Sequence, residues 1–383
     1  MRSIYLDHNA TTPIDTSVLE AMLPFLREEF GNPSSAHALG RRANDAVEQA
    51  RAQVAALIGA RPDEIVFTSG GTEASNIAIR GAVVADPDRR AVVTTGIEHP
   101  ATDACCSLLE GRGHRVARVR PLPDGVVDAE EVAAAIGNRT AVVTIIHAQN
   151  EIGTIQPVAQ IARVARQNGA LVHADAAQSL GKIAFTVDEL GVDLLSIAGH
   201  KLYSPKGIGA LYVRRGVNAP SVLRGAGQES GRRPGTENVA GIVALGEACR
   251  IATLHLAKGT APMAALTASL LGHLKRIVPG IVCVGENSAR LPNTLNVLFP
   301  DISGRKLLEA CPRVLASNGS ACHADSEEPS AILIALGIPR HRALGTVRLS
   351  LGRSTTAQDV EDTASSLAAA WRQLREAAPV AAE

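Results

Sequence analysis

Short apolar runs rich in valine, isoleucine and leucine recur along the first two-thirds of the chain, and segments with helical patterns separate them. The runs are EIVFTSG, AVVTTGIEH, AVVTIIHAQN, ALVHADAAQ, DLLSIAGHK and IGALYVRR. Continuous apolar runs that alternate with helices are typical of a mostly parallel sheet with helices on both faces. The sequence therefore predicts an α/β fold with a doubly wound layer at its centre.

Five of these runs end in a cluster of polar residues. The clusters are residues 69–72, 98–99, 149–150, 175–178 and 200–201. In open α/β sheets, ligands bind beyond the carboxyl ends of the strands. We therefore expect the five clusters to converge on one ligand site.

The pattern changes after about Cys249, where a long alanine- and leucine-rich helix precedes short apolar runs such as NTLNVLF and TVRLSLG. A chain of 383 residues is long enough for two domains. We expect a large domain over residues 14–255. A smaller α+β domain should comprise residues 1–13 and 256–383.

The charge balance limits the classes of partner. Lys and Arg total 38, as do Asp and Glu, which gives no net charge and argues against general attraction to nucleic acid or acidic membranes. The first residues contain no apolar signal core, and no uninterrupted apolar run approaches the roughly 18 residues of a membrane span. Six scattered cysteines show no metal-site spacing. We expect a cytoplasmic protein without metal, whose partners are small molecules or other proteins.

Lys201 follows one apolar run, and Asp175 lies at the end of an earlier run. A lysine amine can form a Schiff base with pyridoxal phosphate, and an acid can keep the pyridine nitrogen of that cofactor protonated. The plain alternative is a surface lysine and a packed acid.

The segment EIVFTSGGTEASNIAIRGAV predicts a strand that runs into a helix through Gly70, Gly71 and Thr72. Glycines allow close backbone approach, and the free N–H groups at a helix start favour a phosphate. His200 is placed to supply a further donor. The alternative is a glycine turn in which Thr72 is an ordinary helix cap.

Three more residues of the clusters suit the same cofactor. His99 could stack on the pyridine ring and shuttle protons, while Asn150 and Gln178 could bind the phenolic oxygen and help to set imine basicity. Each could equally be structural, as a satisfied histidine or as a turn cap.

Arg348 and Cys322 point to the substrate. Arg348 lies on a predicted strand of the small domain, where a guanidinium can grip a carboxylate with two hydrogen bonds. Cys322 lies in the polar stretch ASNGSACHADSEEPS and is a candidate reactive thiol, which could attack a sulfur or selenium atom on the substrate. An edge arginine and an inert loop cysteine are the alternatives.

With these residues in place, the chain resembles the cysteine desulfurases of the NifS/IscS type, which have the class V aminotransferase fold of type I pyridoxal phosphate enzymes. The ordered motifs that carry the likeness are YLDHNATTP, GNPSSAH, FTSGGTEASN, QNEIGTIQP, HADAAQ, GHKLYSPKG, RRPGTENV and VRLSLGRSTT. The resemblance implies a mostly parallel seven-stranded sheet in the large domain. It also implies that the catalytic cysteine loop belongs to the small domain.

The resemblance implies a role for each matching residue. These are the Schiff-base lysine Lys201, the pyridinium partner Asp175, the stacking acid–base His99, the ring-oxygen donor Gln178, the phosphate ligands Thr72 and His200, the substrate-carboxylate ligands Asn150 and Arg348, and the persulfide-forming Cys322. Thr236, in RRPGTENV, would reach the phosphate from the other subunit, so the resemblance also implies a homodimer.

The implied reaction converts L-cysteine to L-alanine and passes the sulfur to Cys322 as a persulfide, then to an acceptor protein, as in iron–sulfur cluster assembly. Two departures leave alternatives open. Ala198 stands where many members have serine, and the loop CHADSEEPS is similar to that of selenocysteine lyases. A selenocysteine lyase that releases selenium and L-alanine is therefore the first alternative. An aminotransferase-like enzyme and a binding module with a degenerate site are the others.

Overall fold

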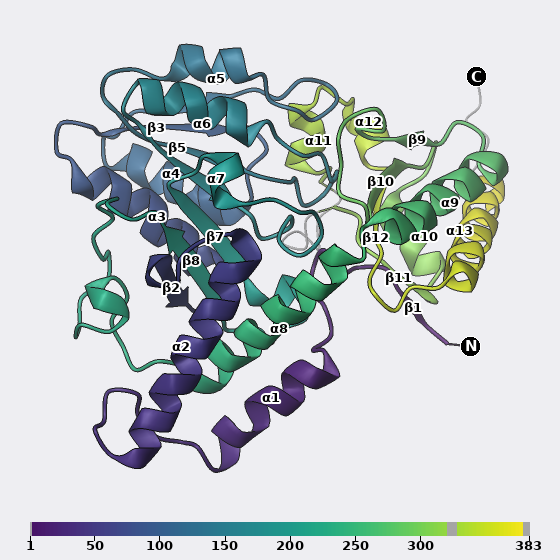
Figure 1. Cartoon of the computed structure of the whole chain (residues 1–383). Coiled ribbons are helices and arrows are strands. Elements are labelled where there is room, and N and C mark those ends of the chain that lie inside the picture. Colours follow the sequence, from purple (N-terminus) through teal and green to yellow (C-terminus); the bar gives the residue numbers. More distant parts are fainter. Residues whose placement is uncertain (1, 320–327, 378–383) are drawn as a thin grey trace.

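A seven-stranded sheet forms the centre of the larger of two lobes in the computed structural model, which describes residues 2–319 and 328–377 (Figure 1). Its strands, in spatial order, are β2 (Ile65–Thr68), β8 (Gly209–Val213), β7 (Leu194–Ala198), β6 (Leu171–Asp175), β5 (Thr140–Ile146), β3 (Ala91–Thr95) and β4 (Val116–Val119). Only β8 runs antiparallel to its neighbours. The predicted mostly parallel seven-stranded sheet is confirmed.

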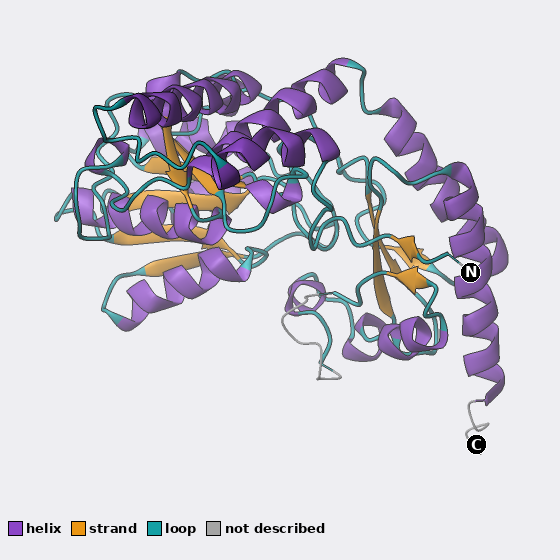
Figure 2. Ribbon diagram, turned by 90° about the horizontal axis from the view of Figure 1, so that it is seen from below, coloured by secondary structure: helices purple, strands orange, loops and turns teal. Residues whose placement is uncertain are grey.

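Helices cover both faces of this sheet (Figure 2). The buried residues of one face pack against α3 (Gly71–Ala85) and α4 (Pro100–Gly111). The other face packs against a larger set of helices, namely α1 (Thr16–Arg27), α2 (Ala38–Ile58), α5 (Ala129–Ala135), α6 (Val158–Gln167), α7 (Val187–Leu190) and α8 (Val239–Ala257). Because both faces are covered, every residue of β2, β5, β7 and β8 is buried.

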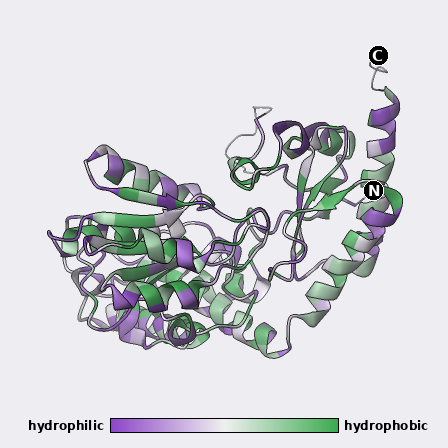
Figure 3. Ribbon diagram, turned by 90° about the horizontal axis from the view of Figure 1, so that it is seen from above, coloured by the Kyte–Doolittle hydropathy of each residue, from purple (hydrophilic) through white to green (hydrophobic). Residues whose placement is uncertain are grey.

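The alternation of side chains in β2 shows how the sequence serves both faces. Ile65 and Phe67 belong to the core shared with α2 and α8, whereas Val66 packs with α3. Successive side chains of a strand point to opposite faces, so an unbroken apolar run is needed when both faces are covered. Hydrophobic residues accordingly run along the strands of both lobes (Figure 3).

The smaller lobe has two short sheets. Its elements are β1 (Ile4–Tyr5), α9 (Ala261–Ile277), β9 (Val282–Cys283), β10 (Thr294–Leu298), α10 (Gly304–Ala310), β11 (Val314–Leu315), α11 (Ala331–Ala335), α12 (Arg340–Ala343), β12 (Thr346–Ser350) and α13 (Ala357–Ala377). Strand β10 pairs antiparallel with β9 and β12, and β1 pairs parallel with β11.

The first residues of the chain pack in the core of this smaller lobe. Ile4 and Leu6 share one apolar cluster with Leu270, Val347 and Trp371. The chain then crosses to the larger lobe, where α1 begins at Thr16. Asp15 caps this helix, because its carboxylate accepts a hydrogen bond from the Ser17 N–H. The domain limits at residues 13/14 and 255/256 stay a prediction, and the second of them falls within α8.

Helix α8 is long and apolar enough to cross a membrane, the one such helix in the part of the chain that the structure describes. Its buried residues belong to the core of the larger lobe, where it packs beside α1 and α2. Burial against protein accounts for its apolar composition as it does for any core helix.

Candidate active site

A cavity of about 910 Å³ lies between the two lobes. All five polar clusters contribute to its lining, through Gly71, Thr72, Glu98, His99, Asn150, Asp175, Gln178, His200 and Lys201. Arg348 of the smaller lobe and the N-terminal residues Asn9 and Ala10 also line it. The expectation that the clusters converge is therefore confirmed.

Lys201 ends a short 3-10 turn, Gly199–Lys201, that directly follows β7. Its Nζ donates hydrogen bonds to the backbone carbonyls of Asn9 and of Ala10, the latter at 2.8 Å. Burial lowers the pKa of Lys201 to about 8, and the nearby Arg348 guanidinium adds to this effect. About a tenth of this amine is therefore uncharged at pH 7, far more than for an ordinary lysine, and that fraction can act as a nucleophile or base.

Asp175 is the last residue of β6 and is only 5 % exposed. One carboxylate oxygen accepts a hydrogen bond of 2.9 Å from the Ala177 N–H. Burial raises the pKa of Asp175, while the neighbouring His99 and Lys201 oppose that rise. A buried acid that forms no ion pair within the described part of the chain is suited to pair with a protonated nitrogen brought in by a ligand.

His99 caps the N-terminus of α4, where its Nδ1 accepts a hydrogen bond of 3.1 Å from the Ala101 N–H. Because Nδ1 is the acceptor, the neutral ring carries its proton on Nε2. Burial lowers the pKa of His99 and favours this neutral form. His99 can therefore present an N–H donor to the cavity.

The N-terminus of α3 closes another part of the cavity. Gly70 precedes the helix with φ 155°, in the region that favours glycine, and as the N-cap residue it has no side chain to cap the first turn. A Cβ on Gly71 would lie 3.3 Å from the Cβ of Ala198, so the backbone there is closely approached. Uncapped N–H groups, the Thr72 hydroxyl and the nearby His200 ring form a donor set that suits a phosphate.

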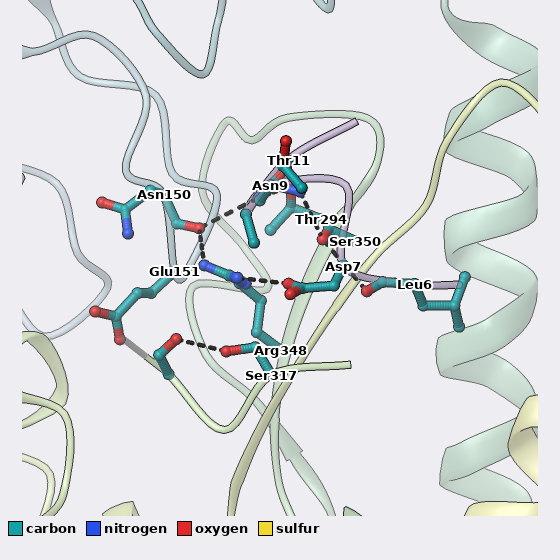
Figure 4. Close-up of polar contacts among 12 residues, drawn as sticks. Leu6, Asp7, Asn9, Thr11, Asn150, Glu151, Thr294, Ser317, Arg348 and Ser350 are labelled. Carbon is teal, nitrogen blue, oxygen red and sulfur yellow. Dashed lines mark hydrogen bonds and ion pairs between the residues drawn. The ribbon is translucent and has the colours of Figure 1, made fainter. Parts of the chain in front are cut away.

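Arg348 enters the cavity from β12 and is held from two sides (Figure 4). Its Nη2 lies 2.6 Å from Oδ1 of Asp7, and its Nη1 donates to the backbone carbonyl of Asn150 at 3.2 Å. The Asn150 side chain is also oriented, because its Oδ1 accepts from Gln149 Nε2 at 3.3 Å. Arg348 Nε is buried and has no hydrogen-bond partner among residues 2–319 and 328–377. The guanidinium lines the cavity, where it can bind a carboxylate.

Sequence reasoning assigned no role to Asn9, although it links the two lobes. Its backbone carbonyl accepts from Lys201 and from Gln178 Nε2, and its Nδ2 donates to Thr294 at 2.9 Å and to the Asn150 carbonyl at 3.2 Å. The motif YLDHNATTP was the available signal, since a polar stretch follows its short strand. Asp7 lies in the same motif and was likewise assigned no role.

Glu98 was placed in a polar cluster but given no role. It is 5 % exposed, and its Oε1 accepts from the Thr95 hydroxyl at 2.5 Å. Burial raises the pKa of Glu98 to about 8, and the charge of Asp175 acts in the same direction. The cavity therefore contains an acid that is mostly protonated at neutral pH.

Two predicted site residues are not in this group. Thr236 lines a separate depression of about 200 Å³ together with Thr68, Ser69 and Asn238. Cys322 lies outside the described residues, although Asn318 and Glu328, on either side of that gap, both line the main cavity. The roles predicted for both stay predictions.

The residues of the cavity fit pyridoxal phosphate. An accessible lysine amine, a buried acid and an uncapped helix start match its aldehyde, its pyridine nitrogen and its phosphate. Among residues 2–319 and 328–377, no group of His, Cys, Asp and Glu side chains is arranged to hold a metal ion.

Comparisons with known proteins agree with this chemistry. The family model described as aminotransferase class V matches residues 4–362. A cysteine desulfurase of Nostoc sp. is 44 % identical over 363 residues, which are 94 % of this chain and 91 % of that protein. The cysteine desulfurase IscS of Dictyoglomus turgidum is 41 % identical over 381 residues, 99 % of this chain and 97 % of that protein.

Solved structures give the same result. A NifS-like protein superposes with a TM-score of 0.90 at 36 % identity, covering 98 % of this chain and all of that one. SspA in complex with cysteine superposes with a TM-score of 0.80 at 35 % identity, covering 91 % of this chain and 99 % of that one. The predicted resemblance is thus confirmed, and the chain belongs to the class V aminotransferase family of pyridoxal phosphate-dependent enzymes.

Proposed function

We propose that this enzyme is a cysteine desulfurase, which converts L-cysteine to L-alanine and transfers the sulfur to Cys322. The observation that carries the proposal is one cavity that joins the Lys201 amine, the buried Asp175 and the Arg348 guanidinium. Relatives that carry the name cysteine desulfurase support a sulfur substrate. They do not favour the alternative of a selenocysteine lyase.

Three side chains of the cavity would bind the substrate and move its protons. Bound pyridoxal phosphate would supply an aldehyde for linkage to Lys201 and would accept electrons from the substrate α-carbon. Arg348 would bind the substrate carboxylate through its guanidinium, which lines the cavity. Lys201 Nζ would remove the α-proton, because its lowered pKa leaves part of it uncharged. His99 would direct its Nε2–H at the bound substrate and cofactor as a hydrogen-bond donor, since its Nδ1 is occupied by the Ala101 N–H.

Cys322 would complete the reaction as a nucleophile. Its thiolate would attack the substrate sulfur, so that an S–S bond forms while the C–S bond of the substrate breaks and its electron pair stays with carbon. Proton addition to that carbon then yields alanine. The persulfide on Cys322 would pass to an acceptor protein, as in iron–sulfur cluster assembly.

Borohydride reduction tests the linkage to Lys201. Reduction of the holoenzyme followed by peptide mapping should label Lys201, and Lys201→Ala should remove both the label and the release of alanine. Label on another side chain, or on none, would refute the proposal.

Product analysis tests the sulfur chemistry. Cys322→Ser should lose persulfide formation, with at least a tenfold loss of sulfide release from cysteine in the presence of a thiol, about 1.4 kcal/mol of barrier. Undiminished sulfide release would exclude a thiolate mechanism. Equal alanine release from cysteine and selenocysteine is compatible with a desulfurase, whereas activity on selenocysteine alone would establish the lyase.

A homodimer in the cytoplasm is part of the same proposal. Thr236 does not line the main cavity. Phe30 is 75 % exposed in the loop before Pro33 and Ser34, which border a depression shared with residues 227–230 and 232. A second copy that covers this face would bury Phe30. Light scattering should give twice the chain mass for the wild type, and Phe30→Asp should shift it toward the monomer with weaker cofactor binding.

A further inference from the structure

Lys182 is a second amine beside the active site that the reaction scheme leaves unused. It lies four residues after Gln178 and is not among the residues that line the cavity. Its Nζ donates to Gln178 Oε1 at 2.7 Å and to Asn9 Oδ1 at 2.8 Å. Within the described part of the chain, no carboxylate forms an ion pair with it, and the charges that act on it are those of Lys201 and Arg348.

The two contacts of Lys182 fix the orientation of two amides. The oxygen and nitrogen ends of an amide side chain have nearly the same shape, so its neighbours decide which end faces which way. An ammonium group has donors only, and both amides turn their oxygens toward it. Burial and the nearby cations lower the pKa of Lys182 well below its ordinary value, but an uncharged amine still keeps two N–H donors.

The opposite ends of both amides consequently act as donors. Gln178 Nε2 donates to the Asn9 carbonyl at 2.9 Å, and Asn9 Nδ2 donates to the Asn150 carbonyl and to the Thr294 hydroxyl. Gln178 is only 3 % exposed and lines the cavity, so its Nε2 is a fixed donor at the cavity wall. If Gln178 turned over, its NH2 group would face the Lys182 amine, and a carbonyl oxygen would replace the donor.

We propose that Lys182 is a positioning residue, which acts through Gln178 to keep an N–H donor directed at the phenolic oxygen of the bound cofactor. The inference rests on the proposed function, in which Gln178 contacts that oxygen. A donor at this oxygen stabilises its anionic form and thereby lowers the pKa of the imine nitrogen linked to Lys201. Loss of the donor should raise that pKa.

The test is a pH titration of the visible absorbance of the holoenzyme. Lys182→Met keeps the length of the side chain but removes its donors, and should move the titration midpoint up by about one pH unit, a tenfold change in the protonation equilibrium. Gln178→Leu should move it in the same direction. The variant with both changes should titrate within about 0.3 units of Gln178→Leu alone, since Lys182 acts through that amide.

Two controls separate positioning from charge and from folding. Lys206→Met removes the charge of an exposed lysine near His200 and should leave the midpoint unchanged. Lys182→Arg keeps the donors and should titrate near the wild type, so it serves if Lys182→Met does not fold. An unchanged midpoint in Lys182→Met, or a shift in the double variant equal to the sum of the single shifts, would overturn the inference. A wild type without any titrating band would instead refute the proposed function, and the inference with it.

Discussion

The ion pair between Arg348 and Asp7 makes a strong prediction about stability. The Arg348 side chain is 3 % exposed, and its Nη2 lies 2.6 Å from Asp7 Oδ1. A guanidinium does not lose its proton in a protein. The substitution Asp7→Asn therefore removes the negative charge paired with this buried cation, while the contact with the Asn150 carbonyl stays.

The size of the effect follows from this geometry. Two unit charges about 4 Å apart interact by about 4 kcal/mol at an effective dielectric constant of roughly 20. Removal of one member of a buried pair costs about 3–5 kcal/mol, because the other charge stays buried. Since asparagine keeps an oxygen acceptor, and Asp7 is 22 % exposed, we expect Asp7→Asn to lower the free energy of unfolding by about 2–3 kcal/mol.

Tryptophan fluorescence during urea unfolding measures this change. Trp371 is the only tryptophan of the chain and packs in the same apolar cluster as Val347 and Leu349, the neighbours of Arg348. Its signal therefore reports the lobe that holds the ion pair. The apoprotein should be used, so that cofactor binding does not alter the transition.

A double-mutant cycle supplies the decisive comparison. In the background Arg348→Met no cation remains to be stranded, so Asp7→Asn should cost less than about 1 kcal/mol there. The same loss of stability in both backgrounds would refute the reasoning, since Asp7 would then act independently of Arg348.

Three further changes test other parts of the structure. The folded protein holds a proton on Glu98 up to about pH 8, whereas the unfolded chain releases it above about pH 4.5. The free energy of unfolding should therefore fall as the pH rises between these values. Melting temperatures measured across this range should show a smaller fall for Glu98→Gln than for the wild type. Burial lowers the pKa of His173 from 6.5 to about 3, so stability should also fall as the pH drops below 6.5, and His173→Gln should lose less than the wild type in the same scans. A Cβ on Gly209 would lie 2.6 Å from the backbone Cα of Gly70, so Gly209→Ala should cost about 1–3 kcal/mol and weaken cofactor binding at the start of α3, measured by equilibrium dialysis. Gly111→Ala meets no atom within 4 Å and should change neither quantity; equal effects of the two alanines would contradict the packing argument.

The local sequence predicted the central sheet and the five polar clusters that line the active site. The strand that ends at Asp175 and the strand that precedes Lys201 are apolar runs bounded by polar residues, and parallel strands bring such ends to one edge. The antiparallel direction of β8 was not predicted, because direction depends on the path of the connection rather than on the composition of a strand. In the structure β8 pairs antiparallel with β7, and Ala198 lies opposite Gly209.

The contacts of Asn9 and Lys182 could not be predicted from local patterns. Asn9 bonds to Ser350, which is 341 residues away, and no periodicity within either segment encodes that approach. Lys182 lies in SLGKIAF, where a lysine between apolar residues has the pattern of an ordinary exposed position. In both cases the tertiary fold, rather than the composition of the segment, decides what the side chain contacts.

The position of β1 has a consequence for biosynthesis. Ile4 pairs with Val314, and the Asn9 N–H donates to the Ser350 hydroxyl 341 residues further along the chain, so residues 4–9 find these partners only after that distant segment has been synthesised. The carbonyls that receive Lys201 belong to that same early stretch. A nascent polypeptide can thus form much of its larger lobe and still lack a competent catalytic centre. Synthesis of the segment that pairs with residues 4–9, and not folding of the larger lobe alone, is therefore needed before the lysine is correctly held.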